Sequence, residues 1–98
     1  MYRQGDILIM PVPDEEAPRV TRPEPRDARG RLVLAYGEAT GHCHAIPGPG
    51  TLSGGFLHLP EGGRLVHEEH DAISLPKGWY RVVRQREYIP GAYRVVAD

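Results

Sequence analysis

The chain has 98 residues, with 12 basic and 13 acidic side chains and a formal net charge of -1. This length predicts a single domain, 1–98, with one modest core. The charge balance argues against a bulk attraction to nucleic acid or to a membrane surface. One cysteine excludes an internal disulfide, and the N-terminus lacks an apolar leader, so we expect a cytoplasmic protein. No apolar run approaches the roughly 20 residues that span a bilayer.

Short apolar runs separated by turn residues follow one another along the chain. The 12 glycines and 10 prolines separate these runs instead of forming a low-complexity block. No stretch of 11 residues shows a 3.6-residue apolar period. The pattern predicts an all-β domain, a small barrel or sandwich of six to eight short strands. The expected strands lie at 7–10, 32–36, 52–59, 64–67, 72–75, 79–89 and 93–96.

One segment, 14–30, differs from the rest of the chain. Pro18, Pro23 and Pro25 lie there among nine charged side chains. Proline removes backbone donors and charge resists burial. We therefore predict a flexible, proline- and charge-rich loop between two strands.

Four of the five histidines fall in two short clusters, and these are the main functional signal in the chain. His42 and His44 are two residues apart, so on a strand both imidazoles share one face. His67 and His70 are three apart, a spacing that suits a turn at a strand end. If the clusters converge, the four histidines would bind a divalent transition metal such as Zn, Fe, Ni, Mn or Cu.

Three neighbouring side chains are additional candidates for the same site. Glu68 and Glu69 lie between the second pair of histidines and offer a carboxylate ligand. Cys43 lies between the first pair, where strand alternation would turn it toward the core as a structural thiol. The competing interpretations are a metal-free histidine cluster with a binding or acid–base role, and surface histidines on two hairpins that never meet.

A second candidate site lies near the C-terminus. Arg81, Arg84 and Arg86 could bind a phosphate or carboxylate group, or a nucleic acid. The alternative is a solvated strand face.

Two resemblances accompany these patterns. The stretches 37–44, 67–70 and 86–88, of the form GExTGHxH, HEEH and REY, resemble a group of short uncharacterised bacterial and phage-encoded proteins. His42-x-His44 and the turn 75–80 also resemble the two cupin motifs, which would imply a small metal-binding barrel. The chain lacks the glutamate that follows the first cupin motif and the histidine that follows Pro-x-Gly. His67 and His70 would have to replace them.

The sequence therefore favours a small metal-binding β-barrel with a histidine site, either an enzyme of unknown reaction or a binding protein. The alternatives are a metal-free interaction or accessory module and a binder of phosphate or nucleic acid. The catalytic residues, the reaction, and the small-molecule or protein partner stay open.

Overall fold

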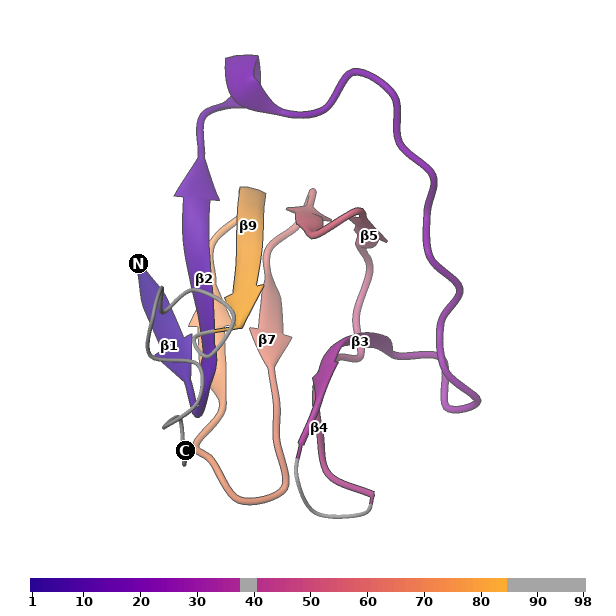
Figure 1. Cartoon of the computed structure of the whole chain (residues 1–98), viewed down its shortest axis with the longest axis vertical. Helices are drawn as coiled ribbons and strands as arrows, with labels where there is room; N and C mark the ends of the chain where they lie inside the picture. Colours follow the sequence, from indigo (N-terminus) through magenta and orange to yellow (C-terminus); the bar gives the residue numbers. More distant parts are fainter. Residues whose placement is uncertain (38–40, 85–98) are drawn as a thin grey trace, which may run out of the picture.

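The computed structural model describes residues 1–37 and 41–84, which form nine short strands and one turn of 3-10 helix (Figure 1). The all-β prediction is confirmed. The strands are more numerous than expected, because Gly54 and Gly55 split the run 52–59 and the N-terminus adds a strand. The expected strand at 93–96 lies outside the described residues. The elements are β1 (Tyr2–Gln4), β2 (Ile7–Val12), η1 (Asp14–Glu16), β3 (Leu32–Tyr36), β4 (Cys43–Ile46), β5 (Thr51–Ser53), β6 (Phe56–Leu59), β7 (Gly63–Leu65), β8 (Ile73–Leu75) and β9 (Gly78–Arg84).

The strands form two layers that resemble a small sandwich. One layer is an antiparallel sheet in the order β1-β2-β9-β6-β5. The other contains the hairpins β3-β4 and β7-β8, which are joined by a bridge between Ala45 and Val66. The sheets do not close into a barrel within 1–37 and 41–84. Of the two predicted architectures, barrel or sandwich, the sandwich-like arrangement is confirmed, and the closed β-barrel named for the histidine site is not.

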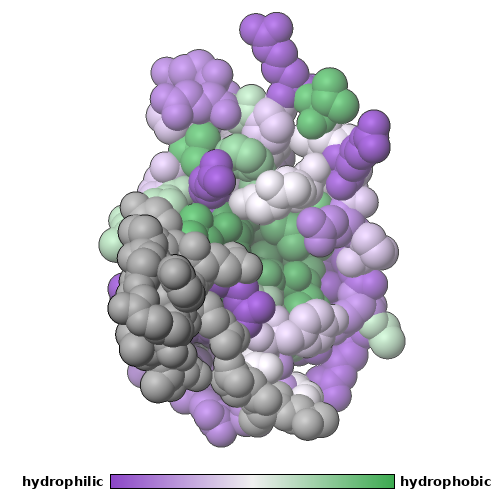
Figure 2. Space-filling view, in the orientation of Figure 1, coloured by the Kyte–Doolittle hydropathy of each residue, from purple (hydrophilic) through white to green (hydrophobic). Residues whose placement is uncertain are grey.

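The core lies between the two layers, and its composition follows the alternation of side chains along each strand. Ile7 and Ile9 on β2 are fully buried, and their register partners on β9 are Arg84 and Val82. Partners in register share a sheet face, so Arg84 lies at one end of the same inner face. Figure 2 shows apolar residues in the middle of the visible face and hydrophilic residues around them. The buried core consists of Ile7, Ile9, Leu32, Ala35, Ile46, Leu52, Leu57, Leu59, Leu65, Leu75 and Tyr80.

The segment 14–31 runs outside the sheets and rejoins them at β3 (Figure 1). It is tied down at several points. The Arg22 and Glu24 amides donate to Ser53 Oγ and Leu52 O on β5. The Arg26 guanidinium donates to the carbonyls of Gly30, Gly48 and Gly50. The segment therefore follows a defined path with few buried side chains, and its flexibility stays a prediction.

Helices do not contribute a membrane-spanning element to this fold. In the part of the chain that the structure describes, no helix has the length and apolar character needed to cross a bilayer.

Candidate metal centre

A single backbone bridge determines which side chains meet at the candidate site. Ala45 on β4 and Val66 exchange two hydrogen bonds, of 3.0 and 2.9 Å, in an antiparallel bridge. In an antiparallel pair, the residue before a paired residue on one strand lies opposite the residue after its partner on the other strand. The bridge therefore sets His44 opposite His67, and the residues on either side follow in the same register. The two histidine clusters, 25 residues apart in the sequence, lie together for this reason.

The four imidazoles form one group around His67. The centroid of the His67 ring lies 5.7 Å from that of His42, 4.4 Å from that of His44 and 4.6 Å from that of His70. The rings of His44 and His70 are nearly parallel, with centroids 6.0 Å apart. The assignment of these residues as metal ligands stays a prediction, but the geometry permits a shared site.

Three of the side chains are close enough to share one ion. Ligand atoms of His42, His67 and Glu68 all lie within 4.8 Å of one another. The three differ in exposure, since both imidazoles are half-buried and the carboxylate is exposed. Two imidazoles and one carboxylate are a known ligand set for Zn²⁺ and Fe²⁺, with positions left for water or another ligand.

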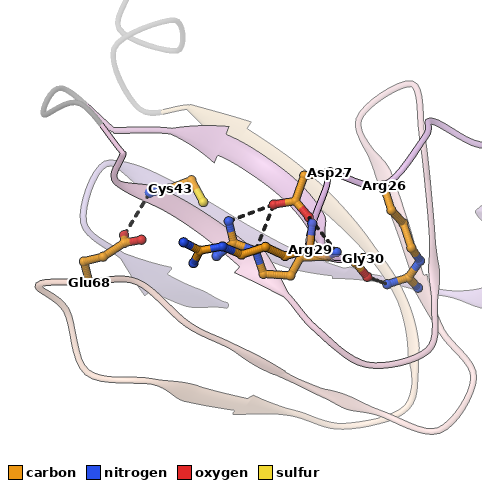
Figure 3. A network of polar contacts seen from close by, with 7 residues as sticks. Arg26, Asp27, Arg29, Gly30, Cys43 and Glu68 are labelled. Atoms are coloured by element: carbon orange, nitrogen blue, oxygen red, sulfur yellow. Dashed lines mark hydrogen bonds and ion pairs between the residues drawn. The ribbon is translucent and has the colours of Figure 1, made fainter.

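The carboxylate of Glu68 is held in place by the backbone of β4. The Cys43 amide donates a 2.9 Å hydrogen bond to Glu68 Oε1 (Figure 3). This hydrogen bond is the main reason that the pKa of Glu68 is lowered, so the group is ionised at neutral pH. Glu69, the other carboxylate candidate, is largely exposed, and its Oε2 lies 3.7 Å from His42 Nδ1.

His44 is buried, with only 2% of its surface exposed, and its proton position follows from its neighbours. Gln4 Nε2 donates to Leu65 O and Asp71 O, at 3.1 and 2.9 Å. Both amide hydrogens are then used, so Gln4 Oε1 must accept from His44 Nδ1, 2.9 Å away. His44 therefore carries a proton on Nδ1, and its Nε2 faces Asp6 Oδ1 at 3.5 Å.

Burial and crowding lower the pKa values of two of the clustered imidazoles, His44 and His67. The pKa of His44 is lowered to about 4, mainly by burial and next by the neighbouring His67, although Asp6 opposes the shift. Burial also lowers the pKa of His67, with His70 as the next cause. Neutral imidazole is the form that binds a metal ion.

The hydrogen bond at His67 sets a condition on metal binding. The Glu69 amide donates to His67 Nδ1 at 3.0 Å, so the neutral ring carries its proton on Nε2. A metal on Nδ1 would displace this hydrogen bond. A metal on Nε2 would require the proton to move to Nδ1, which would also break it. A neutral His67 ligand therefore requires a local change at the Glu69 amide.

Sequence patterns missed the turn between β1 and β2, which supplies Gln4, Gly5 and Asp6 to the site. Gly5 has φ +59°, and a Cβ there would lie 2.7 Å from His70 Nε2 and 3.2 Å from His44 Cε1. The Gly5-Asp6 pair is a recognisable turn signal. However, nothing in the sequence indicates that this turn packs against histidines so far along the chain.

Cys43 lies apart from the group formed by His42, His67 and Glu68. Its residue is buried, and its thiol interacts with the guanidinium of Arg31. Arg31 in turn is paired with Asp27 at 2.7 Å. Figure 3 shows Glu68 reaching the Cys43 amide. This position agrees with the expected buried thiol, and a metal-ligand role for Cys43 stays untested.

The candidate arginines do not form one cluster in the described part of the chain. Arg81 and Arg84 are three apart on a regular strand, so they lie on opposite faces. Arg81 lies 5.6 Å from the Phe56 ring centroid, whereas Arg84 donates to Tyr36 O at 3.0 Å and lies 3.7 Å from Asp6. Arg86 lies outside the described residues.

Comparison with known proteins gives a family without an assigned activity. The model for "Domain of unknown function (DUF8820)" matches residues 3–85. The chain belongs to this family. The match includes every residue of the histidine group and of the β1–β2 turn. Neither the curated proteins nor the solved structures gave a match. The cupin resemblance and the phage link gain no support from these comparisons.

Proposed function

We propose that this DUF8820 domain binds a divalent transition metal through His42, His67 and Glu68, and leaves part of the coordination sphere open. The observation that carries the proposal is the convergence of the three ligand groups within 4.8 Å. An open position would admit water or a small ligand, so the centre could support metal-assisted chemistry or ligand binding. The reaction and the partner remain unassigned.

Three features of the surroundings support a metal ion here. The carboxylate of Glu68 is ionised and oriented by the Cys43 amide. The adjacent His44 is oriented by Gln4, as imidazoles around metal ions are commonly oriented by a hydrogen bond to their second nitrogen. Crowding of four imidazoles is unfavourable when they are charged, and a bound cation would stabilise their neutral forms.

A second candidate function is a metal-free histidine cluster for acid–base chemistry or partner binding. The observation that favours it is the hydrogen bond from the Glu69 amide to His67 Nδ1. This bond leaves Nε2 as a proton donor, which suits a hydrogen bond to an anionic or carbonyl ligand. The two functions predict different responses to added metal. A metal bound through His67 would break the hydrogen bond from the Glu69 amide, whereas a metal-free cluster would keep it.

The experiment is a titration of the metal-free protein with Co²⁺, followed by visible absorption and by the backbone amide spectrum. We expect d–d bands of a four- or five-coordinate ion, and a change at the Glu69 amide as its bond to His67 is lost. His42→Ala, His67→Ala and Glu68→Gln should each remove or strongly weaken the bands.

His58→Ala is the matched control, because His58 stacks on Trp79 with ring centroids 4.4 Å apart and is outside the histidine group. It should retain the bands. Absence of Co²⁺ bands in the wild-type protein, or bands of undiminished intensity in all three ligand variants, would reject the proposed centre. An unchanged Glu69 amide would exclude His67 as a ligand.

A further inference from the structure

His44 and Asp6 form a second pair of donors beside the first three. His44 Nε2 and Asp6 Oδ1 are 3.5 Å apart. Metal–nitrogen and metal–oxygen bonds in such sites are about 2.1 Å long, and two such bonds spanning 3.5 Å meet at about 113°, close to a tetrahedral angle. The separation of the two atoms therefore suits one shared ion, which would lie next to the ion pair of Asp6 with Arg84.

The tautomer of His44 makes its Nε2 available. Gln4 uses both amide hydrogens on backbone carbonyls and so fixes the His44 proton on Nδ1. The Nε2 atom then presents either a lone pair or a second proton toward Asp6. A divalent cation can occupy the place of that proton, as it does wherever neutral imidazole becomes a ligand.

The turn at Gly5 lies against the rings of both His70 and His44. A Cβ on Gly5 would lie 2.7 Å from His70 Nε2 and 3.2 Å from His44 Cε1, the carbon bonded to Nε2. The ring edges of both histidines therefore border the residue next to Asp6. His70 is exposed, so its ring has room to turn toward an ion.

We propose that His44 Nε2 and Asp6 Oδ1, with His70 beside them, form a second divalent-cation position, so that the domain holds a two-metal centre. This inference rests on the proposed function for the first position. The two positions are adjacent, because the ring centroid of His67, a ligand of the first position, lies 4.4 Å from that of His44. Adjacent metal ions of this kind are a common device for activating water or clamping an oxyanion.

The test is the stoichiometry of Zn²⁺, measured by elemental analysis after equilibrium dialysis of the full chain. The wild-type protein should bind two ions. Asp6→Asn should bind one, and Asp71→Asn, which alters an exposed carboxylate on the histidine loop, should still bind two. His42→Ala should lose the other ion and keep the one at Asp6.

The outcomes separate the two proposals. One ion in the wild-type protein that survives Asp6→Asn would overturn the second position and leave the first intact. Two ions in both proteins would overturn it as well. No ion in the wild-type protein would reject the proposed function itself. Circular dichroism of metal-free Asp6→Asn checks its folding, and Asp6→Ser provides a second variant if the first does not fold.

Discussion

At the scale of single residues, the site depends on a few side chains whose orientation is fixed by backbone groups. Gln4 fixes His44, and the Cys43 amide fixes Glu68. Each of these partners comes from a different part of the chain, so the orientation of the ligands is a product of the tertiary fold.

The burial of His44 makes the stability of the metal-free domain depend on pH. The pKa of His44 is about 4 in the folded chain, against 6.5 for an unperturbed histidine. Between these values the unfolded chain binds more protons, so the free energy of unfolding should fall as pH decreases from about 6.5 to 4. The full loss is about 3 kcal/mol.

Urea unfolding at several pH values measures this loss, and His44→Gln is the control because it removes the titrating group. The variant should lose less stability over the same range. If the free energy of unfolding falls equally in both proteins between pH 6.5 and 4, His44 is not held neutral.

The approach of two histidines to Gly5 predicts a specific effect of a single methyl group. Gly5 and Gly54 have similar backbone angles, φ +59° and +56°, but a Cβ on Gly54 meets nothing within 4 Å. Alanine should cost about 1–2 kcal/mol at either position through backbone strain. Only Gly5→Ala should displace His44 and His70.

Imidazole nitrogen spectra of the two variants measure this displacement. Changed His44 and His70 signals in Gly5→Ala, with unchanged signals in Gly54→Ala, are the expected result. Identical spectra for both variants would show that the turn at Gly5 does not contact His44 and His70.

At the scale of elements, the sequence predicted where the strands lie better than it predicted which strands pair with one another. Strand β2 and most of β9 follow from apolar runs bounded by turns. The pairing of Ala45 with Val66 does not, because strands β5, β6 and β7 separate the two residues in the sequence and no local pattern specifies their register. His-x-His was recognisable as a motif, whereas Asp6 and Gln4 were missed because their role arises only when the two layers pack.

The bridge between Ala45 and Val66 should control metal binding without providing a ligand. Val66→Pro removes the amide that donates to Ala45 O and leaves that buried carbonyl without its partner. The cost to stability should be about 1–3 kcal/mol. Affinity for Co²⁺ should fall at least about tenfold, as it does when outer-shell support is lost.

Val66→Ala retains the amide and serves as the control for side-chain loss. Its Co²⁺ affinity should stay close to that of the wild-type protein. Unchanged affinity in Val66→Pro would mean that the histidine loop is positioned by other contacts.

At the scale of the whole molecule, two layers enclose one core, and the site lies where loops from both layers meet. The segment 14–31 connects the layers outside the core and is attached through the Arg22 and Glu24 amides and through the Arg26 guanidinium. The composition of this segment correctly suggested few buried residues. Its path could not be predicted, because it depends on carbonyl groups of a distant turn.

Loss of the Arg26 side chain should open this segment to proteolysis. Arg26→Ala removes three hydrogen bonds to carbonyls and should cost about 1 kcal/mol locally. Trypsin cleavage after Arg29 should then be about fivefold faster, if cleavage follows the open population. Arg19→Ala, at an exposed position, should leave this rate unchanged. Equal rates in both variants would contradict the proposed attachment.

The most direct measurement of the central claim is calorimetric titration of the metal-free chain with Zn²⁺ near pH 7.5, in the wild-type protein and in His67→Ala. His67 is the ring that every other member of the histidine group approaches. The proposed centre predicts saturable binding whose affinity falls at least about 100-fold in His67→Ala, while His58→Ala binds as the wild-type protein does. No binding in the wild-type protein, or equal affinity with and without His67, would contradict it.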